Sequence, residues 1–431
     1  MPLKVTRQAA EIAGHHLGTV VPRPIGTLFP PFFPNDWISD FSIDTIWKTT
    51  ISQAHSSGAQ QRTSLVERPS RVIGTHLAGL SQEDATALQM TLMRMQMHEN
   101  PFPIYSDVTK LEVDLGASAK EVICNVQNKR FYKGQRVAFV NPSFTRQDYG
   151  VLATAIYGEI AETYGTGFTL VDALNNGQSA GVLVYPLIDV NPGLRFNTTL
   201  ASDQTMFLNI QVEEVSGPNT LPGSWGVDIS SYLDYYNGNP IFKLEPNWAS
   251  RVNLSFIRMG NSYSQGRGQH VELHADRPQV QVDITETDLS RSETWDLLRF
   301  FDSRRGRTHP FWILQPLTSH DIIAITATYV DVSIFDYLDN LQTFLTHIGF
   351  EENDGTLHVR QVASIATQDS DKFRITFTDP FTVVPAPIRM APAWLSALRV
   401  DNMEQVWHTN EHSQCSLSTI QVLDEAAYSI G

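Results

Sequence analysis

The residues best suited to chemistry in this sequence are two pairs of histidines, each pair four positions apart. His408 and His412 lie in the stretch HTNEH, which matches the H-x-x-E-H pattern of inverted zinc proteases. That pattern binds metal only on a helix, whereas the following SQCSLSTIQV alternates as a strand does. His270 and His274, in HVELH, also lie in a strand-like stretch, where extended chain holds two such side chains too far apart to share a metal. We therefore expect no metal, and a metal-dependent hydrolase centred on His408 and His412 is kept as an alternative.

Acidic residues next to one another offer little for acid/base catalysis. In the pairs Glu213-Glu214 and Glu351-Glu352 the two carboxylates face opposite sides of a strand, so we expect solvated strand edges. Asp369 and Asp371 lie at the tip of an expected hairpin, where they could form only a weak cation site. Neither a nucleophile elbow nor a phosphate-binding glycine loop occurs, and the two cysteines, Cys124 and Cys415, are expected to be buried. The sequence predicts a protein that is not an enzyme and has no cofactor.

Composition narrows the class of protein further. The chain has 431 residues, and 46 acidic against 31 basic residues give a net charge of -15, which argues against a surface that grips nucleic acid. Neither a membrane-spanning apolar run nor the apolar core of a secretory signal is present. We therefore expect that the protein does not insert into a membrane and that it is assembled in a cytoplasm. The stretch PRPIGTLFPPFFP, residues 22–34, is too rich in proline for a helix. It indicates an extended arm over residues 1–37, lying on its own domain or on a neighbouring subunit.

An internal repeat organises the rest of the chain. Residues 68–104 align without a gap on residues 277–313, an offset of 209 positions. The identities fall on residues that begin or end elements or lie on a helix face: Pro69 and Pro278, Leu80 and Leu289, Ser81 and Ser290, Leu88 and Leu297, Phe102 and Phe311. Each copy predicts a strand, a helix that begins after an N-terminal serine cap, and a second strand that restarts at Pro-Phe. Ser290 and Glu293 form the S-x-x-E capping box, and these repeat residues are our candidate structural core.

The repeat sets the expected fold class and domains. Most other segments alternate as strands do, and "HVRQVASIA" and "KFRITFT" predict a hairpin. A second similarity links the stretches that begin at Trp248 and Trp407. We expect an α+β, mainly β chain: the arm 1–37, a first module over 38–250 with an inserted β-rich segment, and a second module over 251–431. Each module would be a β-barrel or sandwich that carries one packed helix.

Three arginines follow the helix of the second copy. Arg304, Arg305 and Arg307 lie at its expected C-terminus, where cations are favoured by the helix dipole. The first copy has no such cluster at the matching positions, so the fold does not require it. A salt bridge at a subunit interface, a solvated helix cap and an anion site all remain open for these side chains.

The segments ETWDLLRFFDSRRGRTHPFWI, VRQVASIA with KFRITFTDPF, and CSLSTIQVLDE together resemble distal tail and tail-tip hub proteins of long-tailed bacteriophages. The resemblance implies tail-tube-like barrels with a helix packed outside, arranged in a ring around the DNA channel. It also implies contacts with the tail tube protein and with tail-tip or fibre proteins in the virion, past which DNA moves without specific binding. Two modules per chain favour a trimer with pseudo-sixfold symmetry, and a hexamer is the competing assembly. A carbohydrate-binding β-sandwich protein for host attachment is the alternative function, because the chain is rich in tryptophan and tyrosine.

Overall fold

A computed structural model describes fifteen stretches of the chain: 41–53, 60–65, 69–80, 100–141, 156–190, 195–200, 206–215, 233–243, 251–257, 260–265, 268–273, 279–316, 320–333, 345–369 and 372–422. These residues are mainly β, and their one α-helix is α3 (Arg291–Ser303), beside a short 3-10 helix, η1 (Tyr105–Asp107). The expected mainly β class is confirmed. The expected arm 1–37 and the helix expected after Ser81, with Leu88, lie outside the described residues.

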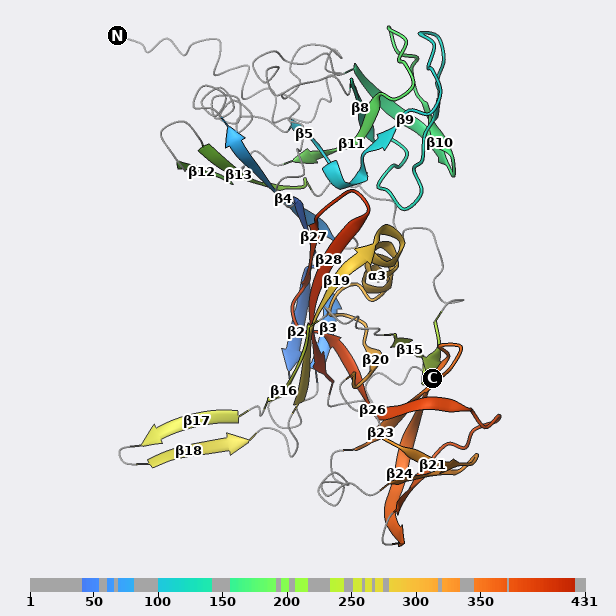
Figure 1. Cartoon of the computed structure of the whole chain (residues 1–431). Coiled ribbons are helices and arrows are strands. Elements are labelled where there is room, and N and C mark those ends of the chain that lie inside the picture. The colour runs from blue at the N-terminus through green and yellow to red at the C-terminus, as the bar shows by residue number, and fades with distance from the viewer. Residues whose placement is uncertain are drawn as a thin grey trace.

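A central antiparallel sheet runs through the middle of the molecule (Figure 1). Its strands follow one another in the order β12, β13, β4, β1, β27, β28, β19, β16. Their bounds are β12 (Arg195–Leu200), β13 (Met206–Glu213), β4 (Ser70–Leu80), β1 (Phe41–Ile46), β27 (Asn402–Trp407), β28 (His412–Gln421), β19 (Gln279–Ser290) and β16 (Arg251–Ile257). The strands alternate buried and less buried side chains, as in FSIDTI of β1, because a strand turns successive side chains to opposite faces.

The two halves of this sheet have the same strand pairing. In the first half Ile46 of β1 lies opposite Ser70 of β4, and in the second half Ile257 of β16 lies opposite Gln279 of β19. Ser70 and Gln279 are 209 positions apart, which is the offset of the sequence repeat. The strands β1, β4, β13 and β12 therefore correspond to β16, β19, β28 and β27, and we call these sets the first and second copy.

Irregularities of the sheet recur in both copies. The β13–β4 ladder shifts register between Leu80 and Leu77, and the β28–β19 ladder shifts between Leu289 and Glu286, 209 positions further on. A β-bulge is a local feature that sequence and twist impose at one place. Its recurrence at matching positions supports a common origin of the two copies.

Short hairpins and a further ladder extend the correspondence. After the first strand of each copy comes a hairpin, β2 (Thr49–Gln53) with β3 (Gln60–Ser64), and β17 (Gly260–Gln265) with β18 (Gly268–Leu273). After β4 and β19, the strands β5 (Asn100–Pro103) and β20 (Phe311–Leu314) pair with β11 (Leu183–Val190) and β26 (Pro387–Leu398). Phe102 lies opposite Ile188, and Phe311 lies opposite Ser396.

Each copy carries an inserted β-structure at the same point, between β5 and β11 or between β20 and β26. Figure 1 places the two insertions at opposite ends of the central sheet. The first contains β6 (Thr109–Lys110), β7 (Glu121–Ile123), β8 (Arg136–Val140), β9 (Ile156–Tyr164) and β10 (Gly167–Leu170). The second contains β21 (Ile322–Ile325), β22 (Tyr329–Ser333), β23 (His347–Glu352), β24 (Leu357–Asp369) and β25 (Lys372–Phe377). Each insertion has its own apolar core, built around side chains such as Phe168 and Phe350.

Three sequence expectations need correction. The stretches at Trp248 and Trp407 do not correspond, because β16 after Trp248 matches β1, whereas β28 after Trp407 matches β13. The described strands of a copy do not close on themselves, so closed tandem barrels are not found: both copies share one sheet instead. The segment with β14 (Tyr235–Tyr236) and β15 (Asn239–Phe242) falls within the expected first module 38–250, yet β15 pairs in parallel with β20 of the second copy.

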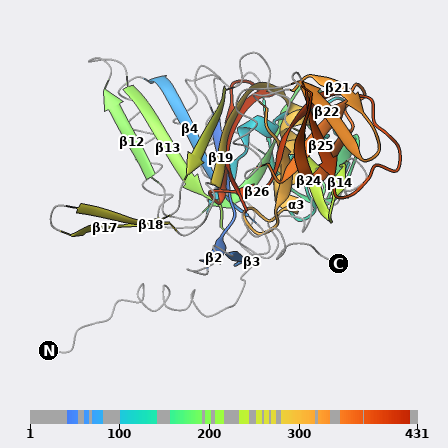
Figure 2. The same cartoon turned by 90° about the horizontal axis from the view of Figure 1, so that it is seen from below.

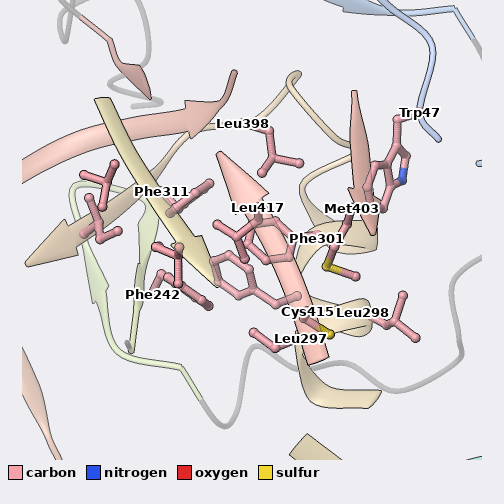
Figure 3. Close-up of a cluster of buried hydrophobic side chains, with 14 of the residues drawn as sticks. Trp47, Phe242, Leu297, Leu298, Phe301, Phe311, Leu398, Met403, Cys415 and Leu417 are labelled. Atoms are coloured by element: carbon pink, nitrogen blue, oxygen red, sulfur yellow. The ribbon is translucent and has the colours of Figure 1, made fainter. Parts of the chain in front are cut away.

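Helix α3 contributes Leu297, Leu298 and Phe301 to a buried apolar cluster of the second copy (Figure 3). The predicted capping box is present: the Ser290 side chain accepts a hydrogen bond from the Glu293 amide, and the Glu293 carboxylate accepts one from the Ser290 amide at 2.7 Å. The apolar face of the helix, with Leu297 and Phe301, packs on Phe311. The ring of Phe301 lies 5.8 Å from that of Phe311, in the edge-to-face geometry that aromatic pairs prefer.

Candidate functional site: the junction between the two copies

The two copies meet along the ladder of β1 with β27. Phe41 lies opposite Trp407 and Ile46 opposite Asn402, and the side chains of Phe41 and Trp407 are fully buried. Strand β1 is one edge strand of the first copy, whose other edge strand is β12. Strand β27 of the second copy matches β12 and not β1. The copies are therefore joined head to tail, each through a different edge. We call this ladder, with the contacts around it, the junction.

The β2–β3 hairpin of the first copy strengthens the junction by reaching the second copy. Arg62 of β3 donates from Nη1 to the carbonyl oxygen of Arg307 at 3.0 Å. The amide of Thr49 donates to the carboxylate of Asp401 at 2.9 Å, and the guanidinium of Arg307 lies 4.0 Å from the same carboxylate. Trp47, buried just before the hairpin, packs on the turn after α3.

Glycine is required at position 306 in that turn. Gly306 has a φ of 64°, in the left-handed region, and a Cβ added there would lie 2.6 Å from the Cβ of Trp47. Any side chain would force the two copies apart at this point. The turn after α3 is thus shaped by its contact with the other copy.

The three arginines singled out from the sequence lie in this turn but have different surroundings. The carbonyl oxygen of Arg307 accepts a hydrogen bond from Arg62 of the first copy, whereas its guanidinium lies 4.0 Å from Asp401 of the second copy. Arg304 is the C-terminal cap residue of α3 and donates to the hydroxyl of Ser303 at 3.2 Å, and burial lowers the pKa of its guanidinium. Arg305 is exposed and has a φ of 50°. The structure therefore does not gather the three side chains into one anion site.

A buried charge cluster ties the first insertion to the junction. Its members are Asp107 of η1, Arg130 of the first insertion and Arg291, the first residue of α3, which are at most 6 % exposed. The carboxylate of Asp107 accepts from Arg291 Nη1 at 3.0 Å, and from the amide and Nη1 of Arg130 at 2.8 and 3.1 Å. Arg291 also donates to the carbonyl oxygens of Ser106 and Asn410. One carboxylate is thus shared by two cations from different parts of the chain.

Aromatic rings and an amide complete the cluster. The guanidinium of Arg291 lies 4.6 Å from the ring centre of Trp407, and that of Arg130 lies 5.3 Å from the ring centre of Trp295. Arg130 also donates to the buried side chain of Gln405 at 3.3 Å. Stacking on aromatic faces lets arginine lose water at a lower cost than an unstacked cation. The cluster therefore fixes the insertion, α3 and β27 relative to one another.

Burial and neighbouring charges shift the pKa values of two members of the cluster, Asp107 and Arg130. Burial alone would raise the pKa of Asp107, but the guanidiniums of Arg130 and Arg291 lower that pKa to about 2. Burial lowers the pKa of Arg130 to about 10, so this side chain is still charged at neutral pH. In this ion network Asp107 is therefore ionised and Arg130 protonated at neutral pH.

Two further acids lie beside this region. Glu214 is only 2 % exposed and lies 3.8 Å from Arg71, and burial raises the pKa of its carboxyl group despite that arginine. The expectation of a solvated edge was therefore wrong for Glu214, although Glu213 is exposed. Asp44 of β1 lies opposite Glu404 of β27, and burial, followed by the charge of Glu404, raises the pKa of Asp44 to about 6.

The candidate core residues of the repeat occupy buried positions wherever their side chains are described. Pro69, Phe102, Leu289, Leu297 and Phe311 are buried, and Ser290 caps α3. Leu80 ends β4. Ser81, Leu88 and Pro278 lie outside the described residues.

The histidine motifs do not form a metal site in the described part of the chain. The stretch 408–411 is the turn between β27 and β28, and there the amide of His408 donates to the carbonyl oxygen of His412 at 3.1 Å. His412 Nδ1 lies 3.0 Å from Asp288, and no group of three or more His, Cys, Asp or Glu side chains that could hold a metal occurs among the described residues. His270 lies on β18, and His274 is outside the described residues.

The other candidate acids have ordinary partners. Glu351 lies 3.2 Å from Arg389, and Glu352 lies 2.6 Å from His358. Asp369 is exposed and lies 2.8 Å from Lys372 at the hairpin tip, whereas Asp371 is not among the described residues. These contacts do not assemble an acid/base couple or a cation site.

Next to the buried charge cluster lies an open polar recess of about 360 Å³. Its lining comes from the first insertion, from the start of α3 and from the β27–β28 turn: Asn125, Gln127, Asn128, Ser290, Arg291, Ser292, Glu411 and His412. Sequence reasoning missed both the recess and the cluster. One signal was available, because Arg291 places a cation in the first turn of a helix, where the dipole disfavours it.

Comparisons with known proteins do not identify the chain: no family model matches it, and neither does any curated protein. Among the described residues, no helix is long and apolar enough to cross a membrane.

Proposed function

We propose that this protein is a structural, non-enzymatic component of a bacteriophage tail tip, a distal tail or hub protein that forms a ring. The observation that carries the proposal is the head-to-tail junction of two copies in one continuous sheet. A module that joins its own duplicate through two different edges leaves one edge of each kind available at the two ends of the shared sheet. Contacts of this heterologous type generate rings when the rotation between modules closes.

Other features support a structural role. The members of the buried charge cluster are paired with one another and buried, which suits a fixed joint rather than a catalytic centre. The resemblance to distal tail and hub proteins suggests where such a ring would lie: between the tail tube protein and the tail-tip or fibre proteins. The virion would be assembled in the host cytoplasm. Each copy would be a tail-tube-like module, and three chains would present six modules to a sixfold tube.

The net charge of -15 fits this location. A channel wall of negative charge repels the phosphate backbone, so DNA can pass through without binding. A ring whose channel wall carries mainly lysine and arginine would contradict this part of the proposal.

The alternative function, a carbohydrate-binding β-sandwich protein, needs exposed aromatic rings that stack on sugars. The five tryptophans in the described part of the chain, Trp47, Trp295, Trp312, Trp394 and Trp407, are all at most 7 % exposed. Binding on a glycan array would favour this alternative.

The test is the mass and symmetry of the purified full-length protein. Light scattering after size-exclusion chromatography should give a multiple of the 48.3 kDa chain, and averaged electron micrographs should show a ring with a central channel. A threefold ring favours the trimer and a sixfold ring the hexamer. A protein that stays monomeric at tens of micromolar contradicts the proposal.

A further inference from the structure

The sheet ends in two strands that correspond to the two strands of the junction. Strand β16 of the second copy matches β1, and strand β12 of the first copy matches β27. Within the described residues, β16 pairs only with β19 and β12 only with β13, so each has one edge without a strand partner. Such edges carry backbone donors and acceptors that readily pair with another chain.

We propose that β16 of one chain pairs antiparallel with β12 of a second copy of the same chain, in the register of the junction. The inference rests on the proposed ring and names the two edges that build it. In the junction Phe41 lies opposite Trp407 and Ile46 opposite Asn402. The positions that match these pairs are Val252 with Leu200 and Ile257 with Arg195, which fixes the register between chains.

Exposure along β16 supports a missing partner. Phe256 is 64 % exposed, whereas the matching residue of the first copy, Thr45, which lies on the junction strand β1, is 3 % exposed. A large apolar side chain on an open strand edge indicates a surface that is covered in the assembled state. In the proposed register Phe256 lies opposite Phe196, an aromatic pair of the kind that stabilises antiparallel strands.

Charge also favours the contact between chains. The junction tolerates two acids opposite each other, Asp44 and Glu404. The matching pair between chains is Ser255 and Asn197, which are uncharged. The proposed contact therefore lacks the like-charge repulsion that the junction within the chain already withstands.

A hairpin provides an independent argument. In the first copy β2–β3 lies against the second copy, to which Arg62 and Thr49 donate hydrogen bonds. Its counterpart β17–β18 projects away from the rest of the described chain in both views (Figures 1 and 2). In the first copy, β2–β3 contacts the copy that pairs with β1. A second chain paired with β16 would lie in the corresponding place, where β17–β18 could contact it.

Disulfide trapping tests the edges and the register together. The double variant Asn253→Cys with Thr199→Cys places one thiol on each edge, at positions that match Ser42 and Val406 of the junction. Opposite residues in an antiparallel pair have Cα atoms about 4.5 to 5.5 Å apart, within reach of a disulfide. Both replaced side chains are exposed and the native cysteines are buried, so the fold and the background reactivity should not change.

Mild oxidation of the assembled variant should link chains into a ladder that ends at a closed ring, with a 199–253 disulfide in the peptide map. Each single variant should give no linked species. Asn253→Cys with Asn197→Cys, two residues out of register, should link much more slowly. Dimers from Asn253→Cys alone would show that two β16 edges meet, and would overturn the inference.

Phe256→Asp gives a second readout on the otherwise native chain. It should reduce the assembled fraction at least tenfold, whereas Ile388→Asp, at a position that is 63 % exposed on β26, should leave it unchanged. An assembled ring that never forms the 199–253 disulfide overturns the edge assignment and leaves the proposed function standing. A ladder that grows without limit supports the pairing and contradicts the ring, and a protein that stays monomeric contradicts both.

Discussion

Replacing Asp107 by Asn should destabilise the protein strongly, because it removes the one anion of the buried charge cluster. Arg130 would then lose its acidic partner, and Arg291 would keep only the exposed Glu411, whose carboxylate lies 3.9 Å from it. Loss of one partner from a buried ion pair costs about 3–5 kcal/mol. Since Asn has nearly the shape of Asp, this cost reports charge rather than packing.

The pKa of Asp107 gives a second value for the free energy by which the ionised carboxylate stabilises the fold. It falls from 3.8 to about 2 in the folded protein, and each pKa unit corresponds to about 1.4 kcal/mol. The folded state therefore gains about 2 to 3 kcal/mol from the ionised carboxylate. Because the folded pKa is depressed, this contribution is complete above pH 3.8 and disappears as the pH falls through about 2.

Urea unfolding followed by tryptophan fluorescence is a suitable assay, since Trp295 and Trp407 lie against the two arginines. At pH 7 Asp107→Asn should lower the free energy of unfolding by about 3–5 kcal/mol. The control Asp369→Asn removes an exposed partner of Lys372 and should cost less than about 1 kcal/mol. A loss below 1 kcal/mol for Asp107→Asn would refute the reasoning, because it would mean that the cluster is hydrated in solution.

Three further substitutions test other parts of the junction and core. Phe311→Ala should cost about 3–5 kcal/mol in chemical unfolding, because the Phe311 ring is fully buried. Gly306→Ala should cost more than about 1 kcal/mol by the same assay, because its Cβ would meet Trp47 at a positive φ. Asp44→Asn should raise the melting temperature at pH 8 and have no effect at pH 4. Burial, then Glu404, raises the Asp44 pKa to about 6, so the wild-type folded state loses stability as the pH rises from about 4 past 6.

Controls separate these effects from general damage. Gly116→Ala should be nearly neutral, because nothing lies within 4 Å of the added Cβ. Glu404→Gln should reproduce part of the Asp44→Asn effect, since it removes the charge opposite Asp44. An Asp44→Asn protein that melts at the wild-type temperature at both pH values would show that the carboxyl group is not perturbed.

Local features of the fold were readable from the sequence. The capping box at Ser290 and Glu293 depends on residues three positions apart, so its signal is contained in a short stretch. The repeat offset was also visible, because identities at matching positions survive along the chain. The hairpin of β24 with β25 followed from alternation on both sides of a turn.

Contacts between distant segments were not readable in the same way. Asp107 and Arg291 are 184 positions apart, and neither position carries a pattern that names its partner. The misplaced similarity between Trp248 and Trp407, and the expected exposure of Glu214, arose because a strand's composition does not say which strands lie beside it. Which polar residues are buried depends on that arrangement.

The sequence alone determined that this is a duplicated, mainly β chain with a capped helix, since periodicity, capping and repetition act over neighbouring residues. The tertiary structure decided how the copies meet: β1 against β27, with acids and arginines buried beside that ladder. Pairing of strand edges depends on backbone groups that every residue carries, so the choice of partner is made by the packing of the whole sheet.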